Sequence, residues 1–288
     1  MSSPPSFNPE QFKISQRKMW DNAAKGWQEW WQTFEHGAQV VSNKLVEIAG
    51  IMPGDRVLDV ATGIGEPAVT AARRVGQKGK VVATDLSAQM IATAKSRAKS
   101  VGLDGIIEFV EIDAEHLDFP EASFNAVLSR WGLMFLPNLP AALARIRKIL
   151  VPQGRLAAAV WAAPPKVPVL DVVFSTVNKQ IGAKGPPPST PGPFSLANTD
   201  ALKMSFVNAG FKDVQLHPVI CTFNFESPSA FTAFHQQIAA PVQLMLASYP
   251  DEKKKQVWDA VTDAASAYAD SHGRVSMDGE SVCVVGTK

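Results

Sequence analysis

Short apolar runs and amphipathic segments alternate through the middle of the chain. The runs RVLDVA (56–61), KVVATD (80–85), IIEFVEID (106–113) and RLAAAVW (155–161) have the length and apolar content of buried strands. Between them, segments such as SAQMIATAKSRAKSVG (87–102) place apolar residues at helical spacing after a serine that suits the N-cap position. Strands that alternate with helices predict βαβ units, an α/β fold with a parallel sheet, and helices on both faces of that sheet.

The segments that flank this core are interpreted as additions to it. Residues 9–50 predict an N-terminal helical cap of two helices, the second beginning near Gly37, and residues 228–278 predict a helical insertion. The Pro- and Gly-rich stretch 163–198 predicts a loop that acts as a lid, either ordered or mobile. In open α/β sheets ligands bind beyond the carboxyl ends of the strands, so these additions are placed to roof a ligand site, with ordinary packing as the alternative. The predicted division is a disordered tail 1–8, the cap 9–50, a ligand-binding core 51–162, the lid loop 163–198, the core continued 199–227, the insertion 228–278 and a terminal core strand 279–288.

Charge and cysteine content limit the classes of partner. The 28 basic and 27 acidic residues give a net charge of +1, so the chain lacks the electrostatic signature of a protein that binds nucleic acid or an anionic membrane. Cys221 and Cys283 have neither paired-motif nor metal-site spacing, so neither a disulfide framework nor a zinc site is expected. The sequence has no secretory leader pattern and no run of about 18 apolar residues, and we expect a soluble, cytoplasmic protein without membrane insertion.

The loop DVATGIGEPA (59–68) follows the first predicted strand and nearly matches a dinucleotide-binding motif. Gly63 and Gly65 permit the tight turn and close ligand approach that NAD, FAD and S-adenosylmethionine sites share. A dinucleotide places its pyrophosphate on free N–H groups at the N-terminus of the following helix. Glu66 would put a carboxylate beside that anion and Pro67 removes one donor, so the loop disfavours a pyrophosphate. S-adenosylmethionine carries a sulfonium and an ammonium group instead, which the acidic Asp59 could help to hold directly or through water.

Acidic residues also end the next two predicted strands. Asp85 stands twenty residues after Gly65, where a carboxylate can accept hydrogen bonds from both ribose hydroxyls, although NAD sites use the same device. Asp113 and Ala114 end the third strand, where a carboxylate could accept from an adenine amino group. Acidic residues after the first three strands together favour S-adenosylmethionine.

With these residues in place, the chain resembles the class I S-adenosylmethionine-dependent methyltransferases, most closely the quinone-biosynthesis C-methyltransferases and their small-molecule relatives. The resemblance covers residues 50–162 through VLDVATGIGEPA, VVATDLSAQMI and IRKILVPQGRLAAAVW. It implies S-adenosylmethionine as cofactor and a three-layer Rossmann-like fold whose seven-stranded sheet is mostly parallel with an antiparallel last strand. The positions that it assigns to the cofactor are Asp59, Ala61, Gly63 and Gly65 at the methionine end, Asp85 at the ribose, Leu86 and Met90 beside the adenine, Asp113 and Ala114 at the adenine edge, and the backbone carbonyl of Ser129.

Two features depart from the family pattern. Ala61 replaces the commonest first glycine of the loop and Glu66 the third, replacements that also occur in the quinone-methylating branch. The sequence RWGLMF (130–135) replaces the GLRN-type sequence of the quinone enzymes proper. The second departure weakens the case for a quinone acceptor but leaves the family resemblance intact.

Candidates for catalysis and for the acceptor site are few. Methyl transfer from a sulfonium requires the acceptor and the methyl group in near-attack geometry, and a base only if the acceptor must lose a proton. His235 is the candidate catalytic base and His36 the second choice, although histidines more often have structural roles. Trp20 and Trp27 are candidates for capping the cofactor, with core packing as the alternative, and Trp131 and Phe135 are candidates for walls of the acceptor pocket. No carboxylate and amide cluster suggests a metal site.

The sequence therefore predicts an enzyme that methylates a small, largely apolar acceptor at carbon, oxygen or nitrogen. An NAD-dependent oxidoreductase on a Rossmann fold is one alternative. A non-catalytic module that binds the cofactor is the other.

Overall fold

The computed structural model describes residues 7–183, 185 and 190–288. Within these residues, seven strands form one sheet in the order β3-β2-β1-β4-β5-β7-β6. The first five strands are parallel, and the last strand in sequence runs antiparallel to both of its neighbours. This confirms the predicted Rossmann-like sheet. The strands are β1 (Arg56–Val60), β2 (Lys80–Asp85), β3 (Ile107–Glu111), β4 (Phe124–Arg130), β5 (Leu150–Trp161), β6 (Lys212–Phe225) and β7 (Val275–Thr287).

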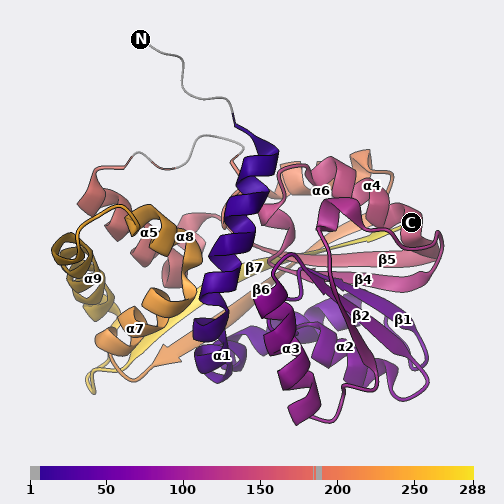
Figure 1. Cartoon of the computed structure of the whole chain (residues 1–288), viewed down its shortest axis with the longest axis horizontal. Helices are drawn as coiled ribbons and strands as arrows, with labels where there is room; N and C mark the ends of the chain where they lie inside the picture. The colour runs from indigo at the N-terminus through magenta and orange to yellow at the C-terminus, as the bar shows by residue number, and fades with distance from the viewer. Residues whose placement is uncertain (1–6, 184, 186–189) are drawn as a thin grey trace.

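Helices cover both faces of this sheet, which gives the three layers visible in Figure 1. In chain order the helices of the described residues are α1 (Pro9–Ile48), α2 (Ala68–Val75), α3 (Ala88–Ser100), α4 (Leu139–Ile149), α5 (Pro168–Ile181), α6 (Thr199–Asn208), α7 (Pro228–Ile238), α8 (Ala240–Leu246) and α9 (Asp251–Ala265). Helices α1, α2 and α3 lie on one face of the sheet, and α4 and α6 lie on the other. Val57, Leu58 and Val60 of β1 are 0% exposed, as expected for a strand covered on both faces.

Helix α1 is one continuous helix of 40 residues, so the prediction of two helices was wrong. The error lies in Gly37, which suggested a break. A Cβ at Gly37 would lie 2.5 Å from the carbonyl oxygen of Thr222 on β6, and one at Gly26 would lie 2.4 Å from the carbonyl oxygen of Gln237. Both glycines therefore permit close packing of α1 against the rest of the protein rather than ending a helix.

The predicted lid loop 163–198 contains helix α5, which corrects its interpretation as irregular structure. Pro168 occupies the first turn of α5, where the N–H group that proline lacks would have no partner within the helix. Gly182 ends the helix in a left-handed conformation (φ 66°). Residues 184 and 186–189 of this segment lie outside the described residues, as do residues 1–6 of the predicted tail. The terminal strand begins at Val275 rather than at 279, so the helical insertion is shorter than predicted.

The lid helices gather at the carboxyl edge of the sheet. Both β5 and β6 pair antiparallel with β7, so β5 and β6 run in the same direction and end at the same edge. Helix α5 follows β5, and α7, α8 and α9 follow β6, so both insertions leave the sheet from this edge and lie together in Figure 1. None of the helices in the described part of the chain is long and apolar enough to cross a membrane.

Candidate active site

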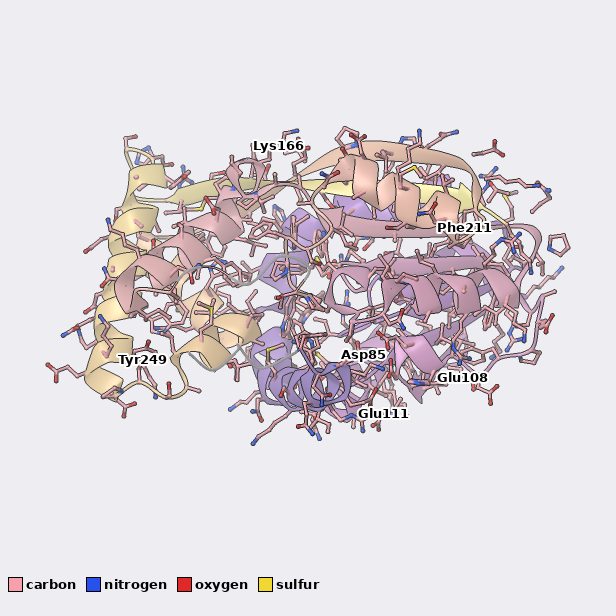
Figure 2. The ribbon with its side chains drawn as sticks, turned by 90° about the horizontal axis from the view of Figure 1, so that it is seen from above. Asp85, Glu108, Glu111, Lys166, Phe211 and Tyr249 are labelled. Atoms are coloured by element: carbon pink, nitrogen blue, oxygen red, sulfur yellow. The ribbon has the colours of Figure 1, made fainter. Side chains whose placement is uncertain are left out.

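A pocket lies at the carboxyl ends of the parallel strands, between α1 and the lid helices. It brings together twelve of the fifteen predicted site residues, namely Trp20, Trp27, Ala61, Gly63, Asp85, Leu86, Met90, Asp113, Ala114, Trp131, Phe135 and His235. Figure 2 shows Asp85 and Glu111 near one another at this edge, between the lid with Tyr249 and the far part of the sheet with Phe211. Asp59, Gly65 and Ser129 do not line the pocket and lie behind its wall.

The loop after β1 has the backbone conformation that its glycines predict. Ala61, Gly63 and Gly65 have φ values of 57°, 56° and 101°. Glycine adopts such values freely, whereas the Cβ of Ala61 makes them cost roughly 1 kcal/mol. Gly132, directly after β4, accommodates that methyl group, because a Cβ at Gly132 would lie 2.5 Å from the Cβ of Ala61. The loop therefore keeps its conformation with alanine in place of the usual first glycine.

Asp59 braces this loop from inside. Its Oδ2 accepts hydrogen bonds from Thr62 Oγ1 at 2.6 Å and from the backbone N–H of Ala68 at 2.9 Å. Asp59 is 0% exposed, and burial raises its pKa to about 8, against hydrogen bonds from Thr62 and Ala68 that favour the ionised form. Asp59 does not line the pocket, so the prediction that it helps to hold the amino-acid end of a cofactor, directly or through water, stays a prediction. The structure supports an indirect effect on a ligand, in which Asp59 stabilises the conformation of the loop.

The first N–H groups of α2 all have partners within the protein. The N–H of Ala68 donates to Asp59 Oδ2, that of Val69 to the Gly65 carbonyl, that of Thr70 to Glu66 Oε2 and that of Ala71 to the Pro67 carbonyl. A pyrophosphate at a helix N-terminus needs such donors free. The N–H groups at the N-terminus of α2 are therefore already used within the protein and are not available to an anion.

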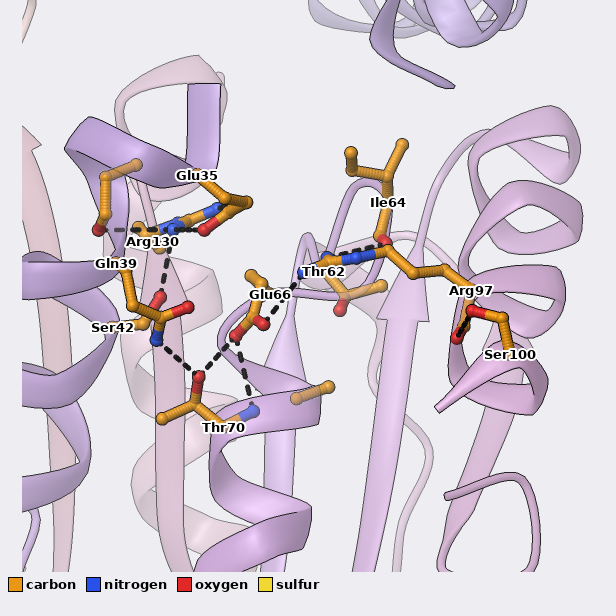
Figure 3. Close-up of polar contacts among 12 residues, drawn as sticks. Glu35, Gln39, Ser42, Thr62, Ile64, Glu66, Thr70, Arg97, Ser100 and Arg130 are labelled. Atoms are coloured by element: carbon orange, nitrogen blue, oxygen red, sulfur yellow. Dashed lines mark hydrogen bonds and ion pairs between the residues drawn. The ribbon is translucent and has the colours of Figure 1, made fainter. Parts of the chain in front are cut away.

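Glu66 takes part in the hydrogen bonds at the N-terminus of α2, as Figure 3 shows. Its Oε1 pairs with Arg97 Nη2 at 3.0 Å, and its Oε2 accepts from Thr70 Oγ1 at 2.6 Å. The guanidinium of Arg97 lies over the ring of Trp31, 4.7 Å from the ring centre. Glu66 thus lines the pocket with its charge compensated by a residue of α3.

Asp85 ends β2 inside the pocket. Its Oδ2 accepts from the N–H of Gly63 at 2.8 Å, and its Oδ1 accepts from the N–H of Ser87 at 2.9 Å. Burial raises the pKa of Asp85 to about 6, with backbone hydrogen bonds opposing the shift, so the group is ionised at neutral pH. Each carboxylate oxygen can accept more than one hydrogen bond, which leaves Asp85 able to accept hydroxyl protons from a ligand.

Helix α1 closes the pocket over the ends of β2 and β3. Lys13 Nζ lies 2.9 Å from Asp113 Oδ2 and 2.6 Å from Glu115 Oε2, and Asp21 Oδ1 accepts from Ser87 Oγ at 2.6 Å. Asp113 also accepts from His116 and from the N–H of Glu115, and these partners lower its pKa although burial opposes the shift. Because a carboxylate has about four acceptor positions, Asp113 keeps one for a ligand.

Sequence reasoning missed Lys13 and Gln16, which line the pocket beside Trp20 and Trp27. Their spacing of three, four and seven residues places all four on one face of a helix. That signal was available in the sequence, although apolar periodicity drew attention to the tryptophans alone.

A buried ion pair joins the middle of α1 to the end of β4, and sequence reasoning missed it as well. Arg130 Nη1 donates to Glu35 Oε2 and to Ser42 Oγ, both at 2.9 Å, and Arg130 Nη2 pairs with Glu35 Oε1 (Figure 3). Burial opposes the charge of Arg130, but Glu35 raises its pKa above the usual range. Arg130 also lines the pocket, so its charge there is compensated.

The other half of the pocket is an apolar chamber. Trp131 stacks on Trp161 with ring centres 4.3 Å apart and 10° between the planes, and its Nε1 donates to Ser281 Oγ at 3.1 Å. Phe34 packs edge-on against Trp131. The lid contributes further walls, which are Leu170, Phe174, Pro193, His235, Ile238, Ala239 and Pro241.

His235 lies in this chamber on α7 and is 1% exposed. Its Nδ1 lies 2.9 Å from the Phe231 carbonyl, which can only accept, so Nδ1 carries the proton. Burial lowers the pKa of His235 to about 4, against the carbonyls of Phe231 and Val169, so the ring is neutral at neutral pH. Whether it acts as a base stays a prediction.

Comparison with known proteins agrees with this geometry. Residues 57–154 match the family described as methyltransferase domain. The chain is 34% identical over 119 residues to a ubiquinone/menaquinone biosynthesis C-methyltransferase of Teredinibacter turnerae, covering 41% of this chain and 48% of that protein. It is 39% identical over 111 residues to the corresponding protein of Pseudomonas putida, covering 38% of this chain and 43% of that one.

Residues 57–154 therefore match a methyltransferase domain, and this core is similar to the class I S-adenosylmethionine-dependent methyltransferases. A solved Bacillus halodurans structure, described as a candidate methyltransferase, is 25% identical with a TM-score of 0.56, covering 86% of this chain and 98% of that one. Phosphoethanolamine N-methyltransferase 2 of Haemonchus contortus, solved with S-adenosyl-L-methionine, shares the fold at 18% identity with a TM-score of 0.60, covering 99% of this chain and 61% of that one. The chain spans less than half the length of the curated relatives named above.

Proposed function

We propose that this protein transfers the methyl group of S-adenosylmethionine to a small, largely apolar acceptor. The observation that carries the proposal is the N-terminus of α2, where the N–H groups already donate to acceptors within the protein. These are the N–H groups of Ala68, Val69, Thr70 and Ala71. A dinucleotide would lack donors for its pyrophosphate there, whereas S-adenosylmethionine has no phosphate.

The proposed cofactor site uses the half of the pocket beside the glycine loop. Asp85 would accept hydrogen bonds from the ribose hydroxyls, Leu86 and Met90 would flank the adenine, and Asp113 and Ala114 would contact its edge. All five residues line the pocket, which supports this proposal. Ala61 and Gly63 would border the methionine end, with Asp59, Gly65 and the Ser129 carbonyl supporting them from behind, and Trp20 would cap the site. Trp27 Nε1 is buried without a partner among the described residues, and this free donor suits the methionine carboxylate.

The chain's own residues would act by positioning the acceptor and excluding water. Bound S-adenosylmethionine supplies a methyl group on a sulfonium, whose C–S electron pair stays on sulfur while the acceptor forms its new bond. Trp131, Phe135 and the lid side chains would hold the acceptor in line with that bond, which is the main requirement of such a displacement. An acceptor whose attacking oxygen, nitrogen or carbon atom carries a hydrogen must release one proton, and His235 Nε2 is a candidate in the chamber to receive it.

The acceptor atom is proposed from the relatives. Both curated proteins described above are named as C-methyltransferases, which favours carbon over oxygen and nitrogen. The apolar chamber, with Trp131 stacked on Trp161, fits a flat apolar acceptor.

Methyl transfer from tritiated S-adenosylmethionine to a panel of apolar phenols, enols and indoles tests this proposal. We expect organic-soluble tritium with at least one acceptor, and at least a tenfold lower rate at subsaturating acceptor in Trp131→Ala, which removes a chamber wall worth about 1.4 kcal/mol or more. Trp258→Ala, on α9 outside the pocket, is the matched control. Transfer that is equal in both variants would contradict the assigned chamber, and reduction of NAD instead of methyl transfer would contradict the function.

A further inference from the structure

Unpaired polar atoms gather around the proposed site. In the described part of the chain five buried side-chain polar atoms lack a hydrogen-bond partner, on Trp27, Asp59, Ser123, Ser129 and His235. Trp27 and His235 line the pocket, whereas Asp59 and Ser129 lie behind its wall. A buried polar atom without a partner is destabilising, so the two atoms on pocket-lining residues indicate groups kept for a ligand.

We infer that His235 Nε2 recognises a hydrogen-bond donor on the acceptor, and that the acceptor is an uncharged apolar molecule bearing a hydroxyl or N–H group. This inference rests on the proposed function and specifies its substrate class. The sequence predicted His235 as a base, and that role stays a prediction beside the recognition inferred here.

The tautomer of His235 fixes which partner it needs. Because Nδ1–H donates to the Phe231 carbonyl, Nε2 presents a lone pair and can only accept. Nε2 has no hydrogen-bond partner among the described residues, so a ligand group that meets it must donate.

The surroundings of His235 would suit an apolar side chain better if no ligand bound there. The ring centres of Phe231 and Phe234 lie 4.2 Å and 4.9 Å from that of His235, and Phe225 lies 6.3 Å away. A phenylalanine at position 235 would extend this aromatic cluster without leaving a polar atom unpaired. The imidazole therefore brings a polar contact that the fold itself does not use.

The charges that line the chamber select an uncharged acceptor. Among the charged residues of the pocket wall, Arg130 is paired with Glu35 and Glu66 with Arg97, so neither has a free charge for an acceptor. His235 is neutral, with a pKa lowered by burial to about 4. A carboxylate or phosphate on the acceptor would enter this chamber without a counterion, which is strongly unfavourable.

Calorimetric titration of the protein with 1-naphthol, naphthalene and 1-naphthoate tests the inference, with and without saturating S-adenosylhomocysteine. The wild-type protein should bind naphthol about tenfold more tightly than naphthalene, since one hydrogen bond in a dry site is worth about 1.4 kcal/mol, and should not bind naphthoate. His235→Phe should lose the preference for naphthol, keep its affinity for naphthalene and melt at or above the wild-type temperature. His235→Gln, which retains an acceptor, should keep part of the preference.

Equal affinity for naphthol and naphthalene in the wild type, absence of naphthol binding, or an unchanged preference in His235→Phe would each overturn the inference. A lower melting temperature of His235→Phe with unchanged preference would identify a structural histidine. Failure of S-adenosylhomocysteine to bind would count against the proposed function alone, because the titrations without it still report on His235.

Discussion

An Asp85→Ala variant is expected to bind S-adenosylhomocysteine about 100-fold more weakly than the wild type, because it loses the carboxylate proposed to accept both ribose hydroxyls. Asp85 is ionised at neutral pH, with its pKa raised only to about 6, and hydrogen bonds to a charged acceptor are the stronger kind. It also fixes the N–H groups of Gly63 and Ser87, so the variant loses loop order as well as a ligand contact. Isothermal titration calorimetry measures the effect.

Two controls separate ligand contact from loop order. Asp85→Asn keeps one acceptor oxygen, and we expect an affinity between those of the wild type and the alanine variant. Glu108→Ala removes an exposed carboxylate from the neighbouring strand β3, outside the pocket, and should bind like the wild type. Equal affinity in Asp85→Ala and Glu108→Ala would show that β2 does not end at the cofactor.

An Arg130→Met variant is expected to lose about 3–5 kcal/mol of unfolding free energy, because it leaves the Glu35 carboxylate buried without its counterion. Glu35 is 5% exposed and has both carboxylate oxygens on the guanidinium of Arg130. For a chain of this size the loss corresponds to a melting temperature lower by about 10 °C. Thermal melting and urea unfolding measure it.

The matched variants test whether the cost comes from the stranded charge. The double variant Glu35→Leu with Arg130→Met replaces both partners by apolar groups, and we expect it to recover most of the lost stability. Lys148→Met breaks the ion pair between Lys148 and Glu121, whose side chains are 63% and 70% exposed. This variant should change the free energy of unfolding by less than about 1 kcal/mol. A double variant no more stable than Arg130→Met would contradict this explanation.

The residues that could be predicted from the sequence are those whose roles are set locally. Asp85 and Asp113 follow predicted strands directly, and the ends of neighbouring parallel strands meet at one edge of a sheet, so their place in the pocket could be inferred. Gly63 and Gly65 require a loop with positive φ, which is what the structure has. Such signals need no knowledge of tertiary contacts.

The residues that were missed or misread depend on contacts between distant parts of the chain. Glu35 and Arg130 are 95 positions apart, and no spacing indicates which buried charges will meet. Gly37 and Pro168 each allow two interpretations, a break or a tight contact for the glycine and a helix end or a helix start for the proline. The packing of α1 against β6 shows that Gly37 makes a tight contact, and the start of α5 at Pro168 shows that this proline begins a helix.

The central claim is that the pocket is built for S-adenosylmethionine rather than for a dinucleotide. Isothermal titration calorimetry of the wild-type protein with S-adenosylhomocysteine and with NAD⁺ tests it most directly. Because the N–H groups at the start of α2 are already used, we predict that S-adenosylhomocysteine binds at least about 100-fold more tightly than NAD⁺. Equal or tighter binding of NAD⁺ would contradict the account.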